Sequence, residues 1–208
     1  MRTKKISKMI RDAVADEEHS ERLSKLIEEI SRQRGAKPTK EGVQGVVNFV
    51  REYAEHVPLF LEQASSAAQQ MGLAAEMGQM LQELERYWFE ANDLLPDHLG
   101  LLGITDDAYA TLLLLQNLSD YCHSTFGRPL LQQNLTAANQ SIRGLIGDPV
   151  VSIIEQRVSI TMANAMIQRI VGQITSGGFS LPTRPDPIWG NASIDEIVNT
   201  RLGAMGVV

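Results

Sequence analysis

The segment DLLPDHLGLLGITDD, residues 93–107, places four aspartates and one histidine within a short stretch of the chain. Carboxylate oxygens are hard ligands for Mg²⁺, Mn²⁺ or Ca²⁺, and an imidazole widens the range of metals that such a group can hold. Paired carboxylates also perform acid and base catalysis where burial separates their pKa values. The sequence therefore predicts a candidate metal site at Asp93, Asp97, Asp106 and Asp107.

Helix capping explains the same acids without any ligand. Asp93 lies where one predicted helix ends, and Asp97 follows a proline in a turn. Asp106 and Asp107 follow Thr105, which we expect to cap the next helix, so their negative charge would meet the positive end of the helix dipole. The spacing matches no known metal loop. A metal site requires at least three of these carboxylates to converge on one ion, whereas caps do not.

The same residues resemble the signature of the YkvA-like domain-of-unknown-function family, whose pattern is close to D-L-I-P-D-x-x-P-x-x-G-x-x-D-D. Gly100 stands where that family has its second proline, and the similarity covers only about residues 87–116. The resemblance implies a helix, an acidic turn and a second helix. The family has no established catalytic activity to carry over, although some members are thought to associate with membranes. The matching positions are Asp93, Leu94, Leu95, Pro96, Asp97, Gly103, Asp106 and Asp107.

Helices must position this segment, because strand signals are nearly absent and long stretches are rich in Ala, Leu, Gln, Glu and Met. We predict an all-α, multi-helix bundle of six to eight helices, with an irregular Pro/Gly-rich C-terminal strap and a short terminal helix. The predicted organisation is an N-terminal helical arm at residues 1–34, a bundle core containing the acidic segment at 39–176, and a linker with a docking helix at 177–208.

Local signals set most of the expected helix boundaries. Apolar residues recur with helical spacing from residue 3 to 33 but are interrupted by the polar DEEHSE patch, which is compatible with two helices or one long one. Cap residues, prolines and glycines divide the rest of the chain. The predicted helix starts are Thr39, Pro58, Ala74, Thr105, Pro129 and the residue after Pro149, and the predicted ends include Gly72 and Gly127.

The long helix predicted after Asp148-Pro149 is apolar around an unusually wide arc. Such an arc exceeds the ~100° stripe of an ordinary surface helix and predicts burial on two fronts, at the centre of the bundle or partly against another subunit. One side carries Val151, Ile154, Val158, Met162 and Ala165, and the other carries Ile153, Ile160, Ile167, Ile170 and Ile174.

The tail beyond this helix changes character at SGGFSLPTRPDPIWGN, which cannot be helical throughout. A capping box from Ser193 to Glu196 then predicts a last short helix. This helix either docks into a groove on a partner or on another protomer, or folds back on its own bundle with Trp189 as an anchor. The predicted partner-binding residues are Trp189, Ile194, Ile197, Val198 and Leu202.

Composition argues against several classes of function. The net charge is -6 and the pI is near 5.3, which disfavours a general nucleic-acid-binding surface. No apolar run approaches the ~20 residues of a transmembrane helix. No G-x-S-x-G elbow, P-loop or G-x-G-x-x-G motif occurs, so no cofactor beyond a divalent metal is predicted. The single cysteine, Cys122, is typical of a reducing compartment, and we predict a cytoplasmic protein.

These observations favour a non-catalytic module for protein-protein interaction or assembly, forming a homo-oligomer or binding a protein partner. The first alternative is a divalent-metal-binding domain or metal-dependent hydrolase centred on residues 93–107. The second is peripheral membrane binding through the basic N-terminal helix, whose cations alternate with apolar residues. Those cations are Arg2, Lys4, Lys5, Lys8 and Arg11.

Overall fold

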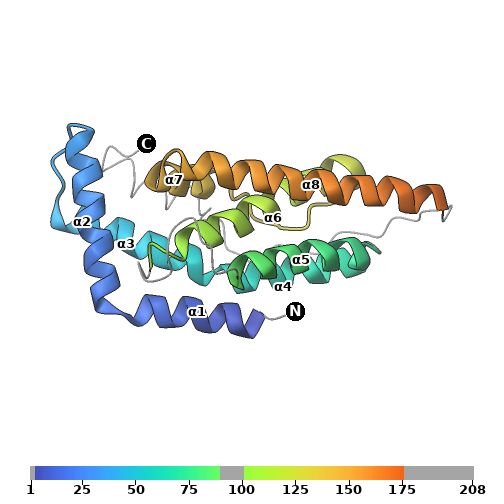
Figure 1. Ribbon diagram of the computed structural model, residues 1–208, viewed down its shortest axis with the longest axis horizontal. Coiled ribbons are helices and arrows are strands. Elements are labelled where there is room, and N and C mark those ends of the chain that lie inside the picture. The colour runs from blue at the N-terminus through green and yellow to red at the C-terminus, as the bar shows by residue number, and fades with distance from the viewer. Residues whose placement is uncertain (1–2, 90–100, 176–208) are drawn as a thin grey trace.

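The computed structural model describes residues 3–89 and 101–175, which form a bundle of helices without any strand (Figure 1). This architecture confirms the predicted all-α fold class, and the count of eight helices in the described ranges falls within the predicted six to eight. The helices are α1 (Thr3–Ala15), α2 (Glu17–Gln33), α3 (Lys40–Glu55), α4 (Val57–Gln70), α5 (Ala74–Phe89), α6 (Thr105–Phe126), α7 (Thr136–Ile146) and α8 (Val150–Thr175).

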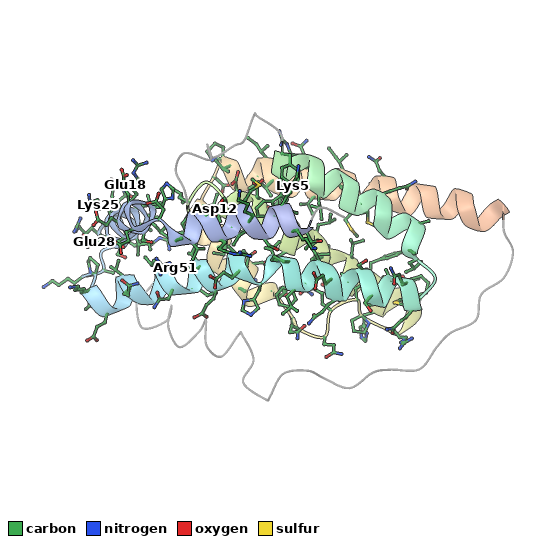
Figure 2. The ribbon with its side chains drawn as sticks, turned by 90° about the horizontal axis from the view of Figure 1, so that it is seen from below. Lys5, Asp12, Glu18, Lys25, Glu28 and Arg51 are labelled. Carbon is green, nitrogen blue, oxygen red and sulfur yellow. The ribbon has the colours of Figure 1, made fainter. Side chains whose placement is uncertain are left out.

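The N-terminal part of the chain forms two helices, which decides between the two arrangements that the sequence allows. The Asp16 carboxylate accepts a hydrogen bond from the Glu18 amide at 2.9 Å and thereby caps α2. Figure 1 shows α2 turned away from the direction of α1 at one end of the molecule. The charged residues Glu18, Lys25 and Glu28 project from α2 in Figure 2. The chain therefore turns at Asp16, the first residue of the polar DEEHSE patch, and the rest of the patch lies in the first turns of α2.

The apolar side of α1 packs into the bundle against α3 and α4. Ile6 and Ile10 are only 1% and 2% exposed, and both belong to the same hydrophobic core as the later helices. A helix that binds a membrane inserts its apolar side into the lipid. In the folded bundle that side of α1 is already covered, so the structure gives no support to membrane binding through this helix.

Short-range signals start and end most helices where the sequence predicts. Thr39 caps α3 by accepting the Gly42 amide at 3.1 Å, and Pro58 lies in the first turn of α4. Gly127 ends α6 in the left-handed conformation, with φ of 69°, which glycine adopts without the steric cost that a side chain would bring. The apolar residues of α3 that recur at helical spacing are buried: Val43, Val46, Val47, Val50 and Tyr53.

Helix α6 is the central element of the bundle. It contacts α3, α4, α5, α7 and α8, and its apolar residues are buried on several sides. Cys122 lies near its C-terminal end and is 3% exposed, as a small buried residue. Because neighbours surround α6, the residues in its first turn are carried into the interior together with its leucines.

The prediction that a helix starts at Pro129 is wrong, since α7 begins at Thr136. The intervening residues 128–135 run without helix over α6. The Leu131 amide donates to Ser119 Oγ at 3.0 Å, and the Leu135 amide donates to Gln116 Oε1 at 2.5 Å. These side chains of α6 replace the backbone acceptors that a helix would supply, and they allow Leu131 and Leu135 to enter the core.

Helix α8 packs against α5, α6 and α7, and as far as its side chains are described, to Asn164, the buried ones lie on one side of the helix. Val151, Ile154 and Val158 on that side are at most 4% exposed, whereas Ile153 and Ile160 are 38% and 53% exposed. The central position that the wide apolar arc allowed belongs to α6, and the part of α8 up to Asn164 is not buried on two fronts. What remains of the prediction is contact of the second side with another subunit.

The predicted strap and docking helix, with Trp189, Ile194, Ile197, Val198 and Leu202, lie outside the described residues. Residues 90–100 lie outside them as well. Within the described helices, none combines the length and the hydropathy that a membrane span requires.

Candidate functional site

The second half of the acidic segment forms the start of α6. Asp106 and Asp107 occupy its first turn, as predicted, and they are buried, with 0% and 1% of their surface exposed. The prediction that Thr105 caps this helix is wrong. Ile104 occupies the N-cap position, and the Thr105 hydroxyl instead donates to the Leu101 carbonyl at 2.6 Å, because Thr105 is already inside the helix.

Packing explains why this first turn is buried. Leu101 and Ile104, which precede the helix, are 0% and 3% exposed and anchor the turn in the core. Trp88, near the end of α5, donates its indole N–H to Thr111 Oγ1 at 2.9 Å and ties the end of α5 to the second turn of α6. This hydrogen bond therefore holds α5 and α6, which flank the acidic segment in the sequence, next to each other.

Two adjacent buried carboxylates are chemically unusual, because burial of a charged group is costly unless it is compensated. Their place at the amino end of α6 supplies part of the compensation, since the helix dipole favours negative charge there. Asp93 and Asp97 lie outside the described residues, so the predicted convergence of four carboxylates stays a prediction. Among the residues that the structure describes, no group of three His, Cys, Asp or Glu side chains is placed to hold a metal ion.

A second polar cluster joins α3, α6, α7 and α8. The Tyr109 hydroxyl donates to Glu155 Oε1 at 2.9 Å, and Arg143 Nε donates to the same oxygen at 2.8 Å. On its inner side, the Tyr53 hydroxyl donates to Asn139 Oδ1 at 2.7 Å. Each of these bonds joins residues on different helices, so the cluster fixes how the helices pack.

The environment of the two tyrosines keeps them protonated at neutral pH. Burial raises the pKa of Tyr53 well above its usual value, with a smaller contribution from the nearby Tyr109. Burial, followed by the hydrogen bond and charge of Glu155, also raises the pKa of Tyr109. The bond to Glu155 raises the pKa of the Arg143 guanidinium in turn. Both phenols therefore stay protonated and donate these hydrogen bonds.

Sequence reasoning missed this cluster. Its one available signal was Glu155, a charged residue among the apolar core positions of α8, where Val151 and Val158 lie one turn before and one turn after it. Nothing in the spacing of Tyr53, Asn139 and Tyr109 marks them as neighbours. The arrangement can position helices and donate hydrogen bonds.

The exposed side of α8 is the remaining candidate surface. The described residues contain four large hydrophobic side chains that are more than one third exposed, and two of them, Ile153 and Ile160, lie on α8. They are seven residues apart, which places them on the same side of the helix two turns apart. The other two are Leu59 on α4 and Phe89 on α5.

No family model, no curated protein and no solved structure matches the chain. The resemblance of residues 87–116 to the YkvA-like family therefore stays a prediction from its motif.

Proposed function

We propose that this chain is a non-catalytic, cytoplasmic module for protein-protein interaction and assembly. The observation that carries the proposal is the double character of α8: as far as its side chains are described, one side is buried and the other exposes two large hydrophobic residues, Ile153 and Ile160. A surface helix normally presents polar residues to water, because contact between apolar surface and water is unfavourable. Covering such surface stabilises the protein. Burial of Ile153 and Ile160 against a partner would therefore stabilise the complex.

The chain after α8 offers a second element for the same function. Residues 193–206 carry the capping box and apolar spacing of a short amphipathic helix, joined to α8 by a Pro/Gly-rich linker. We propose that Ile194, Ile197, Val198 and Leu202 contribute a second contact to the assembly, with Trp189 as an anchor. Removal of the residues after Ser180 would then weaken assembly without unfolding the bundle.

A photo-reactive side chain on α8 tests the interaction directly. A benzophenone amino acid at position 160 should form a covalent adduct in cells that make the chain, because the proposed partner covers this position. The same residue at position 59 serves as the matched control, since Leu59 is an exposed apolar residue on α4. Gel electrophoresis and mass spectrometry identify the adducts. Equal labelling at both positions, or no adduct at position 160, would contradict the proposed function.

The burial of Asp106 and Asp107 favours a second candidate function, divalent-metal binding by the acidic segment. Two buried carboxylates would supply part of the oxygen cage that Mg²⁺, Mn²⁺ or Ca²⁺ requires, and Asp93 and Asp97 would supply further ligands. The YkvA-like resemblance implies a helix, an acidic turn and a second helix, and the bond between Trp88 and Thr111 joins α5 to α6. A metal-dependent hydrolase activity would require this metal site.

Thermal unfolding separates a metal site from helix caps. A metal that binds the folded chain at about 100 times its Kd should stabilise it by ~2.7 kcal/mol, and Asp106→Ala/Asp107→Ala should abolish this gain. Glu17→Ala/Glu18→Ala is the matched control, since it removes two adjacent acids from the first turn of α2 that are exposed. If Mg²⁺, Mn²⁺, Ca²⁺ and Zn²⁺ leave the unfolding temperature unchanged, the carboxylates are structural and the metal hypothesis is wrong.

A further inference from the structure

Isoleucine recurs every seven residues along α8, at positions 153, 160, 167 and 174. A seven-residue apolar repeat is the spacing at which one helix keeps contact with a second helix over several turns. With these isoleucines at the first position of each heptad, the fourth position is occupied by Gln156, Ala163 and Ile170. The helix itself continues without interruption to Thr175.

The described part of this repeat, Ile153 and Ile160, lies on the side of α8 that faces away from the core. Successive residues of a helix are rotated by about 100°, so the repeat falls on the side opposite to Val151, Ile154, Val158 and Met162. Those four residues are at most 9% exposed. Within the part of α8 whose side chains are described, the repeat positions are all exposed: Ile153, Gln156, Ile160 and Ala163. We call these positions, with 167, 170 and 174, the outer seam.

We propose that the outer seam pairs with the outer seam of a second copy of this chain, as two antiparallel α8 helices. This inference rests on the proposed interaction function and names the partner. A heptad seam recognises another helix with the same repeat, and an identical chain supplies one. Because α8 is held in place by its buried side, it does not have to fold on binding.

The lack of charge in the outer seam permits an identical partner at this surface. One chain carries a net charge of -6, so two copies repel each other over most of their surfaces. The outer seam contains no charged residue. Two copies can therefore approach along this line without placing like charges opposite each other. A strongly basic partner, which the net charge would attract elsewhere, gains no ion pair here.

The sizes of the seam residues favour the antiparallel arrangement. In an antiparallel pair, position 160 lies opposite position 163 of the second copy, and position 153 lies opposite position 170. The central layers then pair an isoleucine with an alanine, so large and small side chains alternate across the interface. A parallel pair would instead stack Ala163 on Ala163 and Gln156 on Gln156, which leaves one thin layer and one polar layer in the seam.

The position of α8 in the molecule allows this pairing. Figure 1 shows α8 along one edge of the bundle, with α4, α5 and α6 on one side of it and its C-terminal part extending beyond the ends of α4 and α5. Figure 2, from a direction at right angles, shows the same extension. The bodies of two copies therefore lie on opposite sides of a paired α8.

Light scattering during size-exclusion chromatography of the full chain tests the partner. We expect a mass of twice the 23.0 kDa of one chain. Ile160→Glu should raise the dimer Kd by about a hundredfold or more, because each dimer would bury two unpaired carboxylates. Leu59→Glu is the matched control and should leave the dimer intact, since it places the same acid on an exposed site of α4. Circular dichroism verifies that both variants fold.

Disulfide trapping tests the orientation. An Ile153→Cys chain mixed with an Ile170→Cys chain should form a disulfide-linked dimer, and neither chain alone should do so. In the antiparallel pair, two copies of position 153 are separated by 17 residues of helix, about 25 Å, which is far beyond disulfide reach. The native Cys122 is buried and does not compete. Efficient trapping of Ile153→Cys alone would show a parallel pair and overturn the proposed orientation.

The outcomes separate this inference from the proposed function. A monomeric wild-type chain, together with a photo-adduct at position 160 to a different protein, would overturn self-pairing and leave the interaction function standing. A monomer without any adduct at position 160 would overturn both. A dimer that Ile160→Glu leaves unchanged would place the interface elsewhere and overturn the outer seam.

Discussion

At the scale of single residues, the interior is organised by tyrosine hydroxyls that bridge helices. Tyr53 and Tyr109 have similar roles, but their acceptors differ. Asn139 is 4% exposed and depends on Tyr53 for its side-chain oxygen, whereas the Glu155 side chain is 37% exposed and also binds Arg143. A buried acceptor that loses its donor cannot form a hydrogen bond with water instead, whereas a partly exposed acceptor can.

This difference predicts unequal effects of the same substitution. Tyr53→Phe should lower the free energy of unfolding by about 1–3 kcal/mol, because Asn139 is left with an unsatisfied buried oxygen. Tyr109→Phe should lower it by only ~1 kcal/mol, because water and Arg143 still bind Glu155. Urea unfolding of both variants at one protein concentration measures the difference. An equal or larger loss for Tyr109→Phe would contradict this account.

At the scale of elements, the segment between α6 and α7 depends on side chains of α6 for its backbone hydrogen bonds. Gln116 is 6% exposed and accepts the Leu135 amide, while Ser119 accepts the Leu131 amide. An amide that is buried without a partner destabilises the fold. The segment is therefore irregular in backbone but fixed in position.

We expect Gln116→Ala to reveal this dependence. The substitution should cost about 1–3 kcal/mol of stability by leaving the Leu135 amide without its acceptor, although alanine is the better helix former. Gln140→Ala on α7 is the matched control, because Gln140 is exposed, and its effect should stay within about 0.5 kcal/mol. Chemical denaturation measures both. A Gln116→Ala chain as stable as the control would show that the segment is held by its leucines alone.

At the scale of the whole molecule, the first helix belongs to the core. Ile6 and Ile10 of α1 are as deeply buried as residues of α6, and α1 packs on α3 and α4. The N-terminal arm therefore contributes to the stability of the bundle, which a helix reserved for membrane binding would not do.

The contribution of α1 can be measured with a cavity-forming substitution. Ile6→Ala should lower the free energy of unfolding by about 2–5 kcal/mol, since it removes buried methyl groups and leaves a cavity. Leu59→Ala is the control, because Leu59 is 38% exposed, and we expect a change below about 1 kcal/mol. If Ile6→Ala is as stable as Leu59→Ala, α1 is not packed as described.

The sequence by itself determined the helical class and most helix boundaries. These boundaries depend on signals that act within a few residues of the chain: helical spacing, the Thr39 cap, Pro58 and Gly127. Such signals can be recognised from the sequence without knowledge of the fold. The same local logic placed Asp106 and Asp107 in a first helical turn. It failed at Pro129, where contacts with α6 displace the start of the next helix to Thr136.

Only the tertiary structure decided which residues are buried and which are exposed. It carried Asp106 and Asp107 into the interior, because neighbours surround α6. It paired Tyr53 with Asn139 and Tyr109 with Glu155, which lie 86 and 46 residues apart in the chain. It also decided which of two apolar sides of α8 faces the core. The physical reason is that spacing along one helix shows which residues share a side, whereas the neighbours of that side come from distant parts of the chain.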